Sequence, residues 1–241
     1  AWTTSWGVST RLVGGLVMSH SDDNGLIIPP RLAPRHVAIL PIIRKDEERG
    51  TVLPYCESLA AELRAQQYDG RPVGVVLDTR DMNAGEKSWE WVKKGIPVVL
   101  EIGPRDIASG GVFVGRRDKG RKERFNMPRE EFVAGIADIL ADMQQGLYDR
   151  AKAYRDENTR IIDNWDEFAA FFTPENTNKP EIHGGFALSY WCGSQACEAR
   201  ANDELSVSLR CIPFDAEEHG EGKCVACGGT ARKRVVFAKA Y

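Results

Sequence analysis

Residues 37–43 read VAILPII, and this apolar run decides the fold class of the central part of the chain. An apolar run of this length, rich in β-branched residues, predicts a buried strand. Residues 73–77, 98–102 and 111–115 are similar runs bounded by Gly or Pro, and they predict three further strands. Four strands spaced along about eighty residues leave room for helices between them.

Helical spacing fills those intervals. Apolar residues recur every three or four positions from Leu53 to Leu63, with Pro54 acceptable in a first turn. A short helix is predicted over 87–94, ending near Gly95, and a long amphipathic helix opens at Pro128. Strands that alternate with helices predict an α/β domain over 37–150.

The regions on either side differ from this domain. Residues 1–36 are punctuated by Gly and Pro, whereas residues 151–241 begin with a charged connector. Within the latter, a helix is predicted over 165–172 and strands over 186–191, 207–214 and 234–238. The expected domains are therefore 1–36, 37–150 and 151–241, the last a small α+β unit.

Composition limits the classes of protein. The 241 residues are 42% hydrophobic and 28% charged, with a formal net charge of −3, as in ordinary globular proteins. No apolar run approaches the ~18 residues of a membrane helix, and the start lacks a secretory signal. An acidic balance restricts any nucleic-acid contact to a local patch. Because the chain starts without Met inside a dense motif, we expect it to be one piece of a longer protein.

Two closely spaced cysteine pairs predict a metal site. Cys192 and Cys197 form one pair, and Cys224 and Cys227 the other. Four thiolates in this pattern match a structural zinc site without an open coordination position. Two disulfides, or unlinked buried cysteines, are the alternatives. Cys56 and Cys211 are expected in the core.

A basic segment at 116–124 is the second candidate site. It carries six positive and two negative side chains directly after a predicted strand. The functional interpretation is contact with RNA phosphates, and the alternative is a solvated hairpin loop. The candidates for phosphate contact are Arg116, Arg117, Lys119 and Arg121.

Three stretches near the start of the chain form a group of motifs: TSWGVSTR at 4–11, HSDDNGL at 20–26 and PPRLAP at 29–34. Further along are IGPRD at 102–106, WCG at 191–193, RCIPF at 210–214 and FAKAY at 237–241. Together they resemble class II prolyl-tRNA synthetases of the archaeal/eukaryotic-like type, and the first group is similar to the third signature motif of that family. The resemblance implies the end of a class II catalytic domain, a mixed-sheet α/β anticodon-binding domain, and a small α+β zinc-binding domain.

The same resemblance implies a cytoplasmic, homodimeric ligase that activates L-proline with ATP and Mg and transfers it to proline tRNA. Arg11 matches the catalytic arginine of the third motif, and Ser9, Thr10 and Arg11 the ATP contacts. Trp6 and Gly7 would line the strand beneath the nucleotide. Tyr241 would reach the active site. Because the first two motifs are absent, we expect this chain alone to be inactive.

For the anticodon, the resemblance implies that Arg105 takes the position of a lysine that reads a base. The Glu and Arg readers of the family fall on Val92 and Val99, so this chain departs from the usual readout. The sequence leaves Glu90, Lys94 and Glu101 open as substitutes.

A different class of function is an RNA-binding accessory protein without catalysis, built on an anticodon-binding domain. The TSWGVSTR motif separates the two, since an accessory protein has no need of an ATP-site arginine. Neither class implies a DNA or membrane partner.

Overall fold

The computed structural model describes residues 1–174, 185–216 and 220–239. The chain divides into two compact units, which we call unit 1 (Ala1–Ala151) and unit 2 (Lys152–Tyr241). Each unit is described by itself. No helix in the described ranges is long and apolar enough to cross a membrane.

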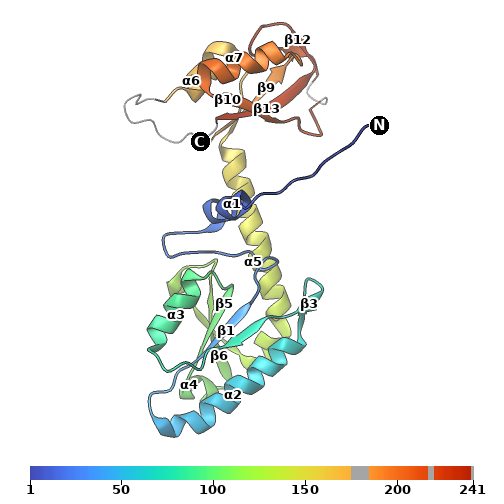
Figure 1. Cartoon of the computed structure of the whole chain (residues 1–241). Coiled ribbons are helices and arrows are strands. Elements are labelled where there is room, and N and C mark those ends of the chain that lie inside the picture. The colour runs from blue at the N-terminus through green and yellow to red at the C-terminus, as the bar shows by residue number, and fades with distance from the viewer. Residues whose placement is uncertain (175–184, 217–219, 240–241) are drawn as a thin grey trace. The chain divides into compact units, whose positions relative to one another are not determined.

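Unit 1 is built on a mixed five-stranded sheet in the order β4-β1-β5-β6-β7 (Figure 1). The first three strands are parallel, and β6 and β7 are antiparallel to their neighbours. All four predicted strands are present, whereas β7 was not predicted. The strands are β1 (Val37–Pro41), β4 (Val75–Leu77), β5 (Val98–Ile102), β6 (Gly111–Arg116) and β7 (Phe125–Pro128), with a separate hairpin of β2 (Gln67–Tyr68) and β3 (Arg71–Pro72).

Helices cover both faces of this sheet. The larger core joins α2 (Asp46–Ala65) and α5 (Arg129–Glu157) to one face, through residues such as Leu59, Phe132 and Ile39. On the other face, Trp91 of α3 (Ala84–Lys93) packs near Leu40 and Val99. Alternate residues of β1 face opposite sides, so a strand buried on both faces must be apolar throughout.

The predicted start of α2 is wrong. The helix begins at Asp46, so Pro54 lies inside it instead of in its first turn. The Glu48 side chain accepts hydrogen bonds from the backbone N–H groups of Arg44 (2.8 Å) and Lys45 (3.3 Å). This capping arrangement satisfies otherwise free donors and favours a helix that begins eight residues before Pro54.

The N-terminal segment packs on unit 1 through its second half. Leu26 and Ile28 donate backbone hydrogen bonds to the carbonyls of Lys93 and Gly95. Gly25 (φ +126°) must be glycine here, because a Cβ would lie 2.7 Å from the Lys93 Cα. Before it, α1 (Arg11–His20) buries no residue, and residues 1–9 form no strand. Trp6 and Gly7, which were expected to line a strand beneath the nucleotide, therefore lie outside any strand in this structure.

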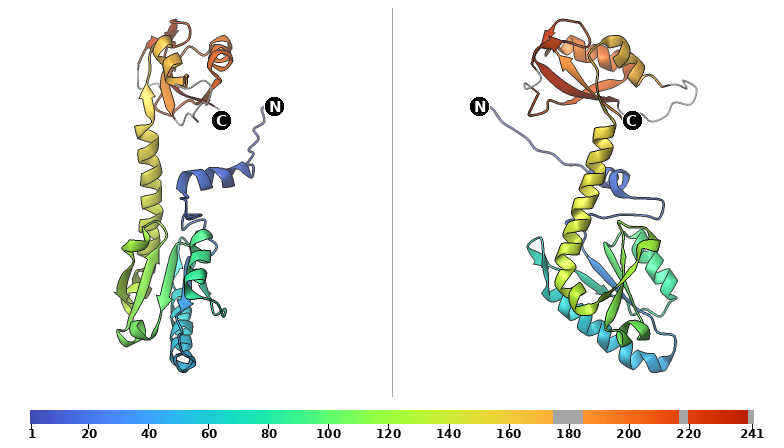
Figure 2. Two further views of the ribbon diagram at one scale, coloured as in Figure 1. Left: turned by 90° about the vertical axis from the view of Figure 1, so that its left-hand side faces the viewer. Right: turned by 180° about the vertical axis from the view of Figure 1, so that it is seen from behind.

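Unit 2 is a four-stranded sheet, in the order β10-β13-β9-β8, with α6 and α7 on one side (Figures 1 and 2). Phe168, Phe172 and Phe237 form the buried centre between helices and sheet. A two-stranded ribbon of β11 and β12 carries the second cysteine pair. The elements are β8 (Thr159–Ile161), α6 (Trp165–Phe172), β9 (Phe186–Trp191), α7 (Gln195–Leu205), β10 (Val207–Cys211), β11 (Gly222–Lys223), β12 (Thr230–Ala231) and β13 (Lys233–Lys239).

Candidate functional site

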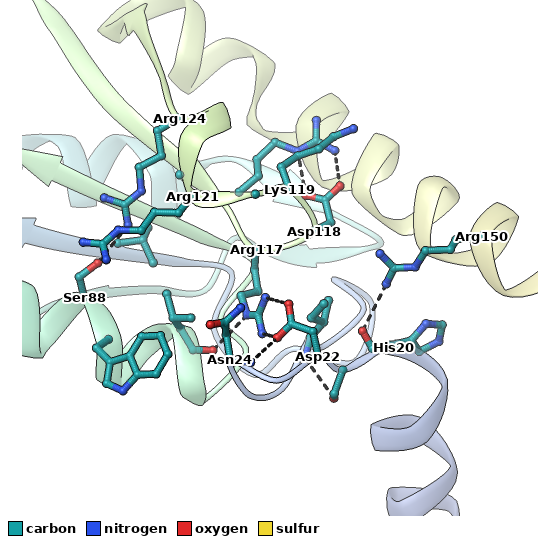
Figure 3. A pocket seen from close by; sticks show the side chains of 18 of the residues that line it. His20, Asp22, Asn24, Ser88, Arg117, Asp118, Lys119, Arg121, Arg124 and Arg150 are labelled. Atoms are coloured by element: carbon teal, nitrogen blue, oxygen red, sulfur yellow. Dashed lines mark hydrogen bonds and ion pairs between the residues drawn. The ribbon is translucent and has the colours of Figure 1, made fainter. Parts of the chain in front are cut away.

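A pocket of about 470 Å³ opens in unit 1 beside the loop that joins β6 to β7 (Figure 3). The segment at 19–27, the inner side of α3, the start of β5 and that loop all contribute to its wall. The strands β5 and β6 are antiparallel, so the start of one and the end of the other meet at this edge of the sheet. The basic segment singled out in the sequence therefore lies on a pocket.

The pocket combines an apolar surface with an exposed aromatic ring. Ile27, Val92 and Val99 line it, and Val99 is buried. Trp89 also lines it and is 44% exposed. Trp91, two residues along α3, instead donates from its ring N–H to Asp78 at 2.9 Å. Residues two apart on a helix point in different directions, so Trp89 remains available at the pocket.

Arg117, one of the candidates for phosphate contact, is buried and paired in this structure. It is 8% exposed, and its guanidinium faces the Asp22 carboxylate in a two-bond pair, with 2.9 Å between Nη1 and Oδ2 (Figure 3). It also donates to the carbonyls of Val92 (3.1 Å) and Gly25 (3.0 Å). Hydrogen bonds from Arg117 lower the pKa of Asp22 to about 2. Arg117 thus holds the N-terminal segment against the pocket wall.

The other three basic candidates differ in whether they already pair with a carboxylate. Arg116 pairs with Asp118 and with Asp142, each at 2.7 Å, so internal carboxylates neutralise it. Lys119 and Arg121 line the pocket and are exposed. Neither has a carboxylate within 4.0 Å among the residues described. Of the four basic candidates, these two are left for a ligand. Arg150 also lines the pocket and donates to the His20 carbonyl at 3.2 Å.

A polar cluster that the sequence did not single out as a group adds hydrogen-bonding capacity. Arg124 donates to Glu101 at 2.6 Å and to the Ser88 hydroxyl at 3.1 Å, and Ser88 donates to Glu101 at 3.0 Å. Gly115 makes room for it, because a Cβ there would lie 3.1 Å from the Arg124 Nε. Ser88 and Arg124 line the pocket. The spacing of these residues in sequence carried no signal of this contact.

Other candidates for base reading lie elsewhere. Arg105 is exposed at the start of α4 (Pro104–Ala108) and does not line the pocket, whereas Val92 and Val99 do. Glu90 pairs with Arg80 at 2.9 Å and with Lys94 at 3.8 Å, away from the lining residues. Of the substitutes left open by the sequence, only Glu101 contacts side chains that line the pocket.

The candidate ATP-site residues form no site by themselves. Ser9, Thr10 and Arg11 are exposed and consecutive where α1 begins, and the Ser9 hydroxyl lies 3.4 Å from the Arg11 backbone N–H. Trp6 is 94% exposed, and a Cβ added at Gly7 would meet no atom within 4 Å beyond its chain neighbours. Tyr241 lies outside the described residues.

Unit 2 brings the four predicted cysteines together. The Sγ atoms of Cys192, Cys197, Cys224 and Cys227 all lie within 4.8 Å of one another. The Sγ of Cys192 is 3.6 Å from that of Cys197 and 3.9 Å from that of Cys227. These separations are too long for disulfides, and four sulfurs around a tetrahedral zinc lie about 3.8 Å apart. The cluster fits a zinc module.

Local structure holds each cysteine pair in place. Cys197 lies in the first turn of α7, and Gly228 (φ +70°) allows the turn in which Cys224 accepts a hydrogen bond from the Gly228 N–H at 2.8 Å. Burial acts to raise the pKa of Cys224, but nearby backbone N–H groups outweigh it and lower the pKa to about 7. Thiolate formation, which metal binding needs, is favoured there.

The remaining two cysteines differ from each other. Cys56 is fully buried, as predicted, and burial raises its pKa to about 12. The prediction of a core position for Cys211 is wrong. It is exposed at the end of β10, beside Ile212, which is 48% exposed.

Comparison with known proteins gives two matching families. A family described as "Anticodon binding domain" matches residues 36–139, and one described as "Prolyl-tRNA synthetase, C-terminal" matches residues 177–241. The chain is 51% identical over 245 residues to a protein named proline–tRNA ligase 2 in Anaeromyxobacter dehalogenans. It is 51% identical over 242 residues to a proline–tRNA ligase of Bdellovibrio bacteriovorus, and 48% to one of Protochlamydia amoebophila.

Each of these alignments covers 100% of this chain but only 47–48% of the relative. The chain therefore spans about half the length of the curated relatives it matches. A non-catalytic accessory protein is not favoured by these similarities, because the relatives are named as ligases.

Proposed function

Because the chain belongs to the prolyl-tRNA synthetase family and corresponds to a C-terminal portion of it, we propose that the complete protein is a proline–tRNA ligase. It activates L-proline with ATP and Mg, and it transfers the prolyl group to proline tRNA. It works in the cytoplasm as a homodimer. Support comes from identity of about one half to proteins named proline–tRNA ligase over the whole chain.

Within that enzyme, the pocket of unit 1 holds an anticodon nucleotide. The observation that carries this proposal is the chemistry of the pocket wall: the exposed Trp89 ring, an apolar surface, and the unpaired cations Lys119 and Arg121. Unstacked RNA bases are bound by stacking on aromatic rings and by hydrogen bonds at their edges, and their phosphates by Lys and Arg. The match of residues 36–139 to anticodon-binding domains agrees with this assignment.

Glu101 and Arg124 are the groups proposed to supply polar contacts where Val92 and Val99 cannot. A carboxylate accepts from the N1/N2 edge of guanine, and a guanidinium donates to its O6/N7 edge. The proline anticodon carries two guanines, so both types of contact are useful. Because the two side chains already pair with each other, a base must share their remaining donor and acceptor positions.

Binding of an anticodon stem-loop RNA tests the pocket. Trp89→Ala and Arg121→Gln should each weaken binding about tenfold, through lost stacking and a lost phosphate contact. Arg105→Ala is the informative comparison, since Arg105 lies outside the pocket. If Arg105→Ala reduces discrimination against an altered anticodon while Trp89→Ala changes nothing, Arg105 is the reader and the pocket assignment is wrong.

Ser9, Thr10 and Arg11 are proposed to contact ATP in the complete protein, with Trp6 and Gly7 beside them and Tyr241 near the reacting groups. A guanidinium can lie on the adenine face and also reach the phosphates, which lysine cannot reproduce. In the full-length enzyme, Arg11→Lys should therefore lower the rate of proline-dependent ATP–pyrophosphate exchange. Unchanged exchange would remove Arg11 from the ATP site.

The four-cysteine cluster is proposed to hold one structural zinc ion. All four ligands are thiolates, so the ion has no open position for a substrate and stabilises the fold of unit 2. Metal analysis of protein purified without chelator should give one zinc per chain. A disulfide between any two of the four cysteines would contradict this assignment.

A further inference from the structure

A second cavity, of about 730 Å³, lies in unit 1 at the carboxyl ends of β1 and β4. From β1 the chain continues into α2, and from β4 into α3, and these helices pack on opposite faces of the sheet. The loops that follow β1 and β4 therefore leave the sheet toward opposite faces, and the cavity lies between them. In open α/β sheets, ligands bind outside the carboxyl ends of the strands.

This cavity is separate from the pocket proposed for RNA. Pro41, the last residue of β1, lines the cavity, whereas Val99, near the start of β5, lines the pocket. The two hollows share no lining residue, although both reach α3: Ala84 and Lys87 line the cavity, and Gly85 and Ser88 line the pocket.

The charges around the cavity favour an anion. Five cationic side chains line it, against the carboxylates of Asp46 and Asp81. One of the five, Arg80, is already neutralised by Asp78 at 2.7 Å and Glu90 at 2.9 Å. The other four have no carboxylate within 4.0 Å among the residues described: Arg44, Lys45, Arg49 and Lys87.

Lys87 is the strongest indication of a missing partner. It is only 6% exposed, and its ammonium has one hydrogen bond in the described structure, to the Asp78 carbonyl at 3.4 Å. The Asp78 carboxylate is used instead by Arg80 and by the Trp91 ring N–H at 2.9 Å. A buried ammonium without a counter-ion is costly, and an anion in the cavity that Lys87 lines would offset that cost.

The first turn of α3 adds a second source of positive potential. Asn83 and Ala84 line the cavity, and the Asn83 side chain accepts a hydrogen bond from the Gly85 N–H at 2.8 Å. The start of a ten-residue helix therefore adjoins the same space as Lys87. Helix N-termini favour negative charge, and phosphate groups in particular.

We propose that this cavity binds a small phosphorylated ligand of nucleotide size, with its phosphate between the Lys87 ammonium and the Arg49 guanidinium. The volume lies within the range of small-molecule sites. Ammonium and guanidinium groups together suit phosphate oxygens, through point charge and paired hydrogen bonds respectively. The inference does not depend on the proposed function, because it uses neither the RNA pocket nor the ATP-site residues.

Calorimetric titration of the 241-residue chain with pyrophosphate and with AMP tests the proposal. We expect saturable binding of both at low ionic strength. Lys87→Gln should weaken binding at least about tenfold, and the exposed Arg49→Gln several-fold. The matched control is Arg35→Gln, an exposed arginine at the amino end of β1 outside both hollows, which should leave the affinity unchanged. If Lys87→Gln fails to fold, Arg49→Gln and the backbone amide NMR shifts of Asn83 and Ala84 still decide the location.

The proposal is overturned by absence of saturable binding, or by binding that Arg35→Gln weakens as much as Arg49→Gln. Shifts confined to other amides would also overturn it. A further arm separates a small ligand from RNA phosphates. Anticodon stem-loop RNA should leave bound pyrophosphate in place, because the RNA pocket and the cavity share no lining residue. Competitive displacement would assign the cavity to the RNA backbone and contradict a separate site.

Discussion

The two units are stabilised in different ways. The larger core of unit 1 lies between one face of the sheet and the helices that cover it. It contains nineteen buried residues, including Leu59, Phe132 and Leu140. In the described part of unit 2, the main core has nine, and the cluster beside it has five, of which two are the metal-site cysteines Cys197 and Cys224. We therefore expect packing alone to hold unit 1, and we expect unit 2 to need a metal ion that bridges its four cysteines.

Metal removal should have the largest effect, and only in unit 2. Structural zinc sites contribute on the order of 10 kcal/mol to folding, so chelation or Cys224→Ser should unfold much of unit 2. Amide hydrogen exchange should become fast in β9 and α7 and remain slow in β1 and β5. Cys211→Ser is the matched control, because Cys211 is exposed and outside the cluster. Equal loss of protection in both units would contradict independent stabilisation.

A hole in the core of unit 1 should have the next largest effect. Phe132 is fully buried, so Phe132→Ala should destabilise unit 1 by about 3–5 kcal/mol. Denaturant unfolding followed by hydrogen exchange of β1 measures this, while zinc content should stay the same. Phe125→Ala, at a position that is 38% exposed, should cost less than about 1 kcal/mol. Loss of zinc in Phe132→Ala would show that the two units depend on each other.

Arg117→Gln tests the structural role assigned to that arginine. It removes the paired hydrogen bonds to Asp22 and those to the carbonyls of Val92 and Gly25. Because Asp22 is partly exposed, we expect a loss of about 2 kcal/mol in unit 1. The salt dependence of RNA binding should keep its slope, since the Arg117 guanidinium is already engaged by Asp22 and two backbone carbonyls. Arg121→Gln should do the reverse, lowering the slope with little change in stability. If both variants change the salt dependence of RNA binding equally, Arg117 contacts phosphate and the structural role is wrong.

The smallest effect concerns pH. The folded-state pKa of Asp22 is about 2, below its ordinary value of 3.8. Its contribution to stability is therefore present above about pH 4 and is lost as pH falls toward 2. Solvent screens this carboxylate, so the change is less than about 1 kcal/mol. The difference in the free energy of unfolding between the unmodified chain and Asp22→Asn should become smaller as the pH falls from about 4 toward 2. A constant difference at all pH values would contradict the pair.

Much of the fold of both units is predictable because its signals are local. The bounds of β5 in unit 1, and of α6 and β9 in unit 2, match the predicted ranges, since each is a continuous apolar or amphipathic run between turn residues. Elements with weak apolar patterns were missed, such as β7, whose residues are mostly exposed, and α7, which is polar and helped by the cysteine pair at its start. The predicted start of α2 was wrong because the Glu48 side chain, and not Pro54, sets where the helix begins.

The functional sites show the same difference between local signals, which the sequence reveals, and contacts between distant residues, which it does not. The four cysteines were predictable, because zinc sites impose short spacings on the sequence. The pocket was only half predictable. A basic segment indicates phosphate contact but does not say which cations remain free, and that depends on distant partners such as Asp22 for Arg117 and Asp142 for Arg116. The sequence did contain a signal for Trp89. It is a second tryptophan on a helix whose core-facing side already has Trp91, so it had to lie on another side of that helix.

The central claim is that RNA recognition resides in the packed unit 1 and does not require the metal of unit 2. The most direct test is the affinity of an anticodon stem-loop RNA for the chain before and after zinc removal, with Trp89→Ala measured alongside. We expect zinc removal to change the dissociation constant less than about twofold, and Trp89→Ala to raise it about tenfold. A large loss of affinity on zinc removal, with Trp89→Ala unchanged, would contradict the claim.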